Sequence, residues 1–231
     1  MTAEPTFRTD MEVTYIDHMG TDRRVAEAAW TSTRGDRPGR DPERLIHRLA
    51  RDGHTGTFEH NVLTVRANVP VFVARQWHRH RTQSFNEVSG RYVEMEPVFW
   101  LPGEDRPLIQ SGGPMDYRRE RGSADQWVST VHALRVAAGA AWTDYLTLLE
   151  NGVTKEVART VLPSSLFTQF YATANLRNWL HFLDLRTDPT AQTEIREAAG
   201  QVEAIVKRLW PTAWTAWRTA ADQTGTFFDP E

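Results

Sequence analysis

Residues 70–91 read PVFVARQWHRHRTQSFNEVSGR, and this stretch changes from apolar to strongly basic within a few positions. Pro70 is typical of the first turn of a helix, and apolar and polar residues follow it at helical spacing, so the sequence predicts a helix over 70–81. The small and polar residues of 82–92 then indicate a shaped loop. A basic helix is therefore expected to lead directly into a loop rich in hydrogen-bonding groups.

The basic residues of this stretch form a candidate anion-binding group. On a helix, Arg75 and Arg79 share one face with Gln76 beside them, which places donors suited to phosphate or to the carbonyls of uracil. If the loop folds back, Arg91 reaches the same phosphate, and the Ser89 hydroxyl and nearby backbone amides add donors. A single exposed arginine usually belongs to a solvated face, but this many arginines beside a polar loop favour a binding site.

The histidines allow a second interpretation, a metal site. The candidate ligands are His54, His60, His78 and His80, with Glu59 or Glu87 as an oxygen donor. The surrounding arginines would repel a cation, so the sequence favours no metal, and a structural role for all four histidines is the commoner case.

The rest of the chain mixes helices and strands without a regular alternation or a repeat. Helices are expected at 21–31, 41–52, 124–150, 154–162, 175–186 and 190–209, with another from Pro211, and strands at 58–69, 93–102 and 165–174. Residues 103–122 are the most loop-like and could act as a lid. The expected fold class is α+β, an antiparallel sheet flanked by helices in one domain over 1–231.

Composition excludes several classes of protein. The chain has 231 residues, a net charge of −3 and no cysteine, which rules out disulfides, thiolate metal sites and thiolate nucleophiles. It lacks a signal sequence and a long apolar run, so a cytoplasmic protein without membrane association is expected. The near-neutral charge gives no global field for binding nucleic acid.

Four segments together resemble one known family. Arg79-His80-Arg81, seven further residues and then Ser89 match the signature of the flavin-dependent thymidylate synthases. The other matching segments are DGHTGTFEH at 52–60, KEVARTVLP at 155–163 and ATANLRNWLHFLDLR at 172–186, in the family's order and at similar separation. The resemblance covers about 10–220 and implies the fold of that family, with a homotetramer whose sites are shared between subunits.

The resemblance also implies roles for individual residues. The positions similar to those that hold FAD are Ser32, His54, Glu59, Arg79, His80, Arg81, Asn175, Arg177 and His181. The positions similar to those that hold the nucleotide are Gln76, Arg79, Glu87, Ser89, Gly90, Arg91, Arg159 and Arg186. The residues expected to act in catalysis are Arg79, Ser89, Arg91 and His54: the two arginines stabilise charge on the uracil ring, Ser89 binds and polarises it, and His54 lines the flavin and folate side. The chain departs from common family residues near the flavin at Trp30, Thr31, Gly56, Thr57, Phe167 and Asn178.

The implied reaction is methylation of dUMP at C5 with methylenetetrahydrofolate as carbon donor, reduced FAD as hydride source and NADPH as reductant. The absence of cysteine fits this route, because the unrelated cysteine-dependent enzymes need a thiolate. Some relatives in nucleoside-antibiotic pathways methylate UMP, which is the main alternative. A remote alternative is a noncatalytic nucleotide- or RNA-binding module using the arginines and nine tryptophans, although most of those tryptophans lie at core spacings.

Overall fold

The computed structural model describes residues 4–33, 35, 41–113 and 117–224, without the side chains of 222–224. The chain falls into two compact units. The first, called unit 1, comprises Met1–Met11, Asn68–Arg75 and Glu87–Gln169, and the second, unit 2, comprises Glu12–Ala67, Gln76–Asn86 and Phe170–Glu231. In the described part of the chain, no helix combines the length and apolar character needed to cross a bilayer.

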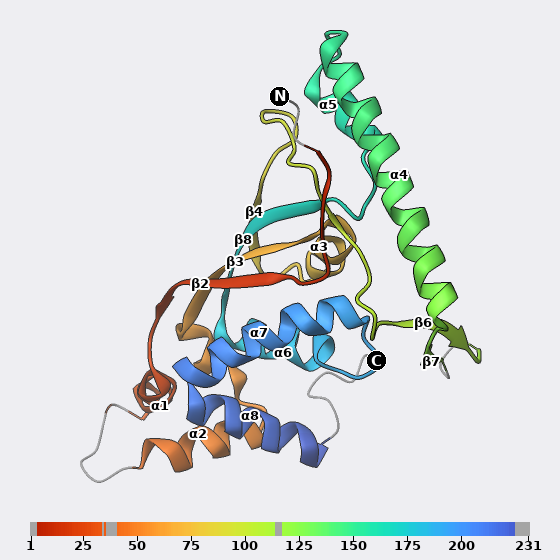
Figure 1. The fold of residues 1–231 in the computed structure, drawn as a ribbon. Helices are drawn as coiled ribbons and strands as arrows, with labels where there is room; N and C mark the ends of the chain where they lie inside the picture. The colour runs from red at the N-terminus through yellow and green to blue at the C-terminus, as the bar shows by residue number, and fades with distance from the viewer. Residues whose placement is uncertain (1–3, 34, 36–40, 114–116, 225–231) are drawn as a thin grey trace. The chain divides into compact units, whose positions relative to one another are not determined.

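A four-stranded sheet in the order β2-β3-β8-β4 has most of its residues in unit 2 (Figure 1). Its strands are β2 (Glu12–Met19), β3 (Val62–Pro70), β8 (Phe167–Asn175) and β4 (Ser84–Glu87). The helices of the unit are α1 (Asp22–Thr31), α2 (Pro42–Arg51), the 3-10 helix η1 (Thr55–His60), α6 (Leu176–Arg186), α7 (Thr193–Leu209) and α8 (Pro211–Thr224). Alternate residues of β3 are fully buried, as the sequence alternation predicts for a strand with one face on the core.

Aromatic side chains fill the core of unit 2. Trp77 and Trp179 are fully buried, and the Trp77 ring lies 4.8 Å from that of Phe182, centroid to centroid. The Trp179 indole nitrogen donates to the carbonyl of Leu63 at 3.0 Å, which ties α6 to β3. Since buried indoles need a hydrogen-bond partner, this contact also fixes the register of helix on sheet.

Unit 1 is built around the long helix α4. Its elements are β1 (Thr6–Arg8), α3 (Val71–Trp77), β5 (Val98–Trp100), β6 (Pro107–Ser111), β7 (Arg118–Arg121), α4 (Ala124–Glu150), α5 (Lys155–Ala158) and the 3-10 helix η2 (Arg159–Val161), with α3 ending across the unit boundary. Ser123 caps α4 through a reciprocal capping box with Gln126. Trp142 and Tyr145 on α4 pack in a buried cluster with Phe99.

The α+β class with an antiparallel sheet is confirmed, and the structure departs from the sequence prediction in several local features. β1 and β5 form a parallel pair, which the sequence did not indicate. Residues 103–122 are not simply a loop, because β6 and β7 within them form an antiparallel hairpin; 114–116 lie outside the described residues.

The predicted helix over 70–81 is also too long. α3 ends at Trp77, and the following amides of Arg79 and His80 bond three residues back instead of continuing the helix. The buried Trp77 indole donates to Gln83 at 3.0 Å, so the chain must turn immediately after the tryptophan. Residues 84–87, expected in a loop, form the strand β4.

Candidate active site

Arg79 and Arg81 lie in the turn after α3, not on its face. The predicted shared helix face of Arg75 and Arg79 is therefore wrong, since the helix stops two residues before Arg79. Arg79 and Arg81 are exposed, and neither guanidinium has a hydrogen bond or ion pair with another residue in the described part of the chain. Both keep their full donor capacity for a ligand.

His80, between them, is buried with 7% of its surface exposed. Arg186, at the end of α6, donates its Nε to His80 Nε2 at 2.9 Å and its Nη2 to the backbone carbonyl of Gln76 at 3.4 Å. A ring nitrogen that accepts from a guanidinium carries no proton, so His80 is neutral with its proton on Nδ1. Two predicted ligand residues, His80 and Arg186, therefore bind each other.

The electrostatics agree with a neutral imidazole. Burial lowers the pKa of His80 from 6.5 to about 4, and the positive charges of Arg186 and His181 act in the same direction. Burial also lowers the pKa of His181, helped by Arg177 and Arg186, and it lowers the pKa of Arg186 itself, helped by Arg79. The charges around His80 and His181 thus make this part of unit 2 electropositive, which suits the binding of an anion.

Gln76 belongs to a chain of side chains that the sequence did not reveal. Its Nε2 donates to Gln192 Oε1, and Gln192 Nε2 donates to Glu194 Oε2 at 2.7 Å. Gln192 is the residue before α7 and Glu194 lies in its first turn, with 2% of its surface exposed. In the sequence these two residues resemble ordinary helix-start residues, so only the fold indicates their link to Gln76.

The predicted nucleotide residues of unit 1 lie together. A Cβ added at Gly90 would lie 2.9 Å from Met95 Sδ and 3.0 Å from Arg159 Cδ, so the absence of a side chain lets Arg159 approach the loop closely. The backbone amide of Arg91 donates to Ser89 Oγ at 3.4 Å, which shapes the loop as a turn.

Two further contacts restrain that loop. The Arg91 Nε donates to Glu156 at 2.8 Å in an exposed ion pair, and Glu156 was not singled out from the sequence. Thr168 Oγ1 donates to Glu87 Oε1 at 2.5 Å, which holds the Glu87 carboxylate beside β8. Glu87 and Arg91 are thus each held by a neighbouring element of unit 1.

Four of the residues expected at the flavin form two groups in unit 2. Ser32 and His54 line one cavity of about 850 Å³, together with Trp30 and Thr57, two of the positions that depart from the family. Glu59 and Arg177 form an ion pair at 2.6 Å, and Arg177 Nε is a buried donor without a hydrogen-bond partner among the residues that the structure describes.

Asn175 has a structural bond of its own: it caps α6 by accepting from the Asn178 amide at 3.0 Å. Its side-chain NH2 group stays available as a donor, because the cap uses only the oxygen. One predicted flavin residue therefore starts the helix and, as far as the described residues go, keeps its NH2 group without a protein partner.

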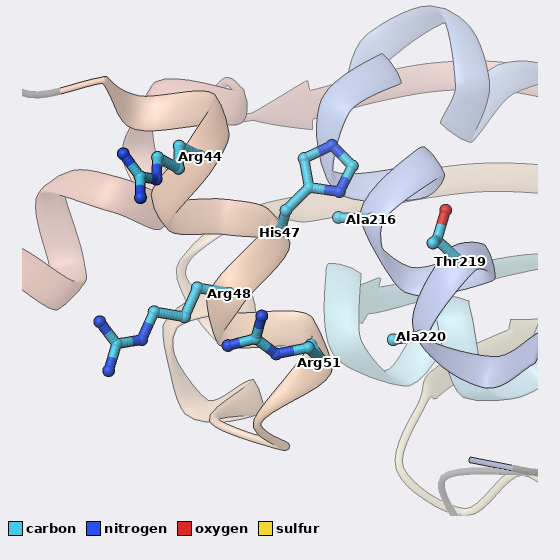
Figure 2. A pocket seen from close by; sticks show the side chains of 7 residues that line it. All are labelled: Arg44, His47, Arg48, Arg51, Ala216, Thr219 and Ala220. Atoms are coloured by element: carbon cyan, nitrogen blue, oxygen red, sulfur yellow. The ribbon is translucent and has the colours of Figure 1, made fainter. Parts of the chain in front are cut away.

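A further cavity of about 410 Å³ lies between α2 and α8. Its lining is Arg44, His47, Arg48 and Arg51 with Ala216, Thr219 and Ala220. Figure 2 shows His47 pointing toward α8, whereas the guanidinium groups of Arg44 and Arg48 extend away from it. Asp52 pairs with both Arg48 and Arg51, so these basic groups do not converge on one ligand.

The metal interpretation gains no support. Within the described ranges, no three histidine, aspartate or glutamate side chains lie close enough to hold an ion.

Comparison with known proteins identifies the family. A family profile described as "Thymidylate synthase complementing protein" matches residues 14–212. A flavin-dependent thymidylate synthase of Streptomyces avermitilis is 41% identical, with 94% of each chain covered, and one of Thermus thermophilus is 40% identical, with 89% of this chain and 74% of that protein covered.

Comparison with solved structures supports the same family. The UMP/dUMP methylase PolB from Streptomyces cacaoi bound with 5-Br UMP has a TM-score of 0.87 and 37% identity, covering 93% of this chain and 96% of that one. Its complex with 5-Br dUMP has a TM-score of 0.86 at 37% identity, covering 92% and 97%. The Arg79-His80-Arg81 and Ser89 signature, the three accompanying segments and these matches lead to one conclusion: the chain belongs to the flavin-dependent thymidylate synthases and is an enzyme of that type.

Proposed function

We propose that the protein methylates C5 of dUMP to form dTMP, taking the carbon from methylenetetrahydrofolate and reducing equivalents from NADPH through FAD. The observation that carries this proposal is the close approach of the Arg159 side chain to the Ser89-Gly90 turn, which brings together residues that carry hydrogen-bond donors because Gly90 has no side chain in the way. A phosphate or a uracil carbonyl fits such a group of donors, because the oxygen atoms of the ligand accept hydrogen bonds.

The proposed roles follow from where each side chain is held. Ser89 and Arg91 bind and polarise the nucleotide, with the position of Arg91 restrained by Glu156. Arg79 has no protein partner within the described residues, so it is available to stabilise negative charge that develops on the uracil ring. Arg186 binds the nucleotide from a position fixed by neutral His80. No step uses a protein thiolate, since the chain has no cysteine.

FAD fits the groups available in unit 2. Ser32 and His54 open onto one cavity, and Arg177 Nε is a buried donor that finds no partner in the described part of the chain, as expected for a group that a cofactor satisfies. Glu59, His80, Arg81, Asn175 and His181 would complete its binding. When bound, reduced FAD supplies the hydride that turns the transferred methylene into a methyl group.

UMP is a second candidate substrate. The solved relative with 37% identity is a UMP/dUMP methylase with structures bound to 5-Br UMP and to 5-Br dUMP. A pocket that tolerates one additional hydroxyl needs little change unless a polar group is built to exclude it. We also propose a cytoplasmic homotetramer with sites shared between subunits; a monomer by light scattering in the presence of FAD and dUMP would contradict that assembly.

Anaerobic turnover tests the proposed reaction. The FAD-loaded protein is given methylenetetrahydrofolate and NADPH with dUMP or UMP, and the products are identified by mass. We expect dTMP from dUMP, and 5-methyl-UMP in addition if the enzyme is a specialised methylase. A protein that binds no FAD and methylates neither nucleotide would refute the proposal.

A further inference from the structure

The side chains of Gln76, Gln192 and Glu194 form a hydrogen-bonded chain that ends on a buried carboxylate. Gln76 Nε2 donates to Gln192 Oε1, and Gln192 Nε2 donates to Glu194 Oε2 at 2.7 Å. Glu194 is 2% exposed, whereas Gln76 is only half-buried and can contact a ligand. These hydrogen bonds therefore connect a rigid position in the core of unit 2 to a residue at the surface of that unit.

The carboxylate fixes the direction of every bond in this chain. An ionised carboxylate only accepts, so Gln192 must turn its NH2 group toward Glu194 and its oxygen toward Gln76. Gln76 must then turn its own NH2 group toward Gln192. A glutamine amide alone can rotate by half a turn and exchange its donor and acceptor, but here that rotation would place two like groups against each other.

The backbone beside the Gln76 amide is also held. Arg186 donates to the Gln76 carbonyl at 3.4 Å, and the same guanidinium is bound to His80. The residue is thus restrained at both its main chain and its side chain. Restraint of this kind lowers the entropy lost when a ligand binds.

Within the described residues, the restrained Gln76 amide has one N–H and its Oε1 without a partner, and these are a neighbouring donor and acceptor. A phosphate only accepts hydrogen bonds, so it does not match this pair, whereas the neutral part of a uracil nucleotide does. Its N3–H lies next to a carbonyl on the uracil edge, and each sugar hydroxyl is both donor and acceptor.

We propose that Gln192, oriented by Glu194, is a positioning residue that fixes the Gln76 amide to read the neutral part of the nucleotide. This inference rests on the proposed function, because it requires Gln76 to contact a uracil nucleotide. It assigns roles to two residues outside the motifs that identify the family.

Two variants test it in the FAD-loaded protein. Gln192→Leu removes the amide at similar size, and Glu194→Gln keeps shape while allowing the chain to reverse. We expect Gln192→Leu to raise the KM and Kd for dUMP about tenfold with kcat within about threefold of wild type, and Glu194→Gln to raise both constants several-fold. Gln201→Leu is the matched control, since Gln201 lies on α7, as Glu194 does, but accepts from the Val13 amide; the KM of this variant for dUMP should equal that of wild type.

A nucleotide without a sugar 3′-hydroxyl separates the two parts of the ligand. If Gln192→Leu weakens calorimetric binding of dUMP and 2′,3′-dideoxy-UMP equally, the amide reads the base; if only dUMP is weakened, it reads the sugar. Either result supports the positioning role. Unchanged KM and Kd for dUMP in both variants would overturn this inference alone, whereas a wild-type protein that binds no uracil nucleotide would overturn it together with the proposed function.

Discussion

Replacing His80 by glutamine should remove a specific part of the protein's acid sensitivity. In the folded protein the pKa of His80 is about 4 against 6.5 for a free histidine, with burial as the main cause. Between these two values the unfolded chain binds a proton at this residue and the folded chain does not. Stability from His80 is therefore complete above pH 6.5 and is lost as pH falls toward 4.

The magnitude follows from the shift. A difference of about 2.5 units at about 1.36 kcal/mol each gives roughly 3 kcal/mol lost between pH 7 and pH 4. The exposed fraction of His80 is only 7%, so solvent screening reduces this value little. In His80→Gln the amide oxygen still accepts from Arg186 but does not titrate, so the variant should lose about 3 kcal/mol less than wild type over this range.

The assay is urea unfolding of the FAD-free protein at several pH values and one protein concentration, with equal m-values as the check that the unfolded states match. His181 contributes acid sensitivity of the same sign, because its pKa is also lowered, and this contribution persists in the variant. Parallel curves for wild type and His80→Gln would refute the reasoning. An NMR titration in which the His80 ring protonates near pH 6.5 in the folded wild type would refute it independently.

Three other substitutions have defined outcomes. Burial raises the pKa of Asp184 to about 6, so ionisation of its carboxyl group destabilises the fold as pH rises from 4 to 6. The free energy of unfolding of Asp184→Asn should therefore gain about 1–3 kcal/mol relative to wild type over that range. A difference in urea unfolding that stays constant with pH would contradict this. Gly90→Ala should displace Arg159 and weaken dUMP binding about tenfold by calorimetry, with a melting temperature close to that of wild type. Ser123→Ala should cost about 1 kcal/mol in urea unfolding, because it breaks the capping box of α4 without touching the site.

Local sequence signals predicted where elements begin better than where they end. Asp41 and Ser123 are residue types that favour helix starts, and both cap a helix: Asp41 accepts from the amides of Glu43 and Arg44, and Ser123 accepts from the amide of Gln126. The end of α3 was missed because it depends on the bond from Trp77 to Gln83, a contact that helical periodicity does not encode. Because α3 ends before Arg79, the predicted shared helix face of Arg75 and Arg79 does not form.

The hairpin within 103–122 was missed for a different reason. All four residues of β7 are exposed, so the strand has no buried face and shows no alternation of apolar and polar residues. Its backbone pairing with β6 is what defines it. Composition alone correctly indicated a polar, exposed segment but not its conformation.

Motif residues are easier to recognise in a sequence than the residues that hold them in position. Arg79, Ser89 and Arg91 stand close together in the chain, and the proposed nucleotide site could be outlined from that spacing. Glu156, which restrains Arg91, and Gln192, which restrains Gln76, are distant in sequence from the residues they hold, and neither was singled out from the sequence.

In an enzyme whose difficult chemistry belongs to a cofactor, the protein contributes mainly position and charge. The arginines among the described residues contribute position and charge in two different ways. Within the described residues, the guanidinium groups of Arg79 and Arg81 have no protein partner and can bind ligands, whereas neutral His80 holds the guanidinium of Arg186 in position. Because His80 can hold Arg186 only while it lacks a proton on Nε2, the same burial that depresses its pKa also keeps the arginine in place. The acid sensitivity of the fold and the preorganisation of the proposed nucleotide site thus have one physical cause.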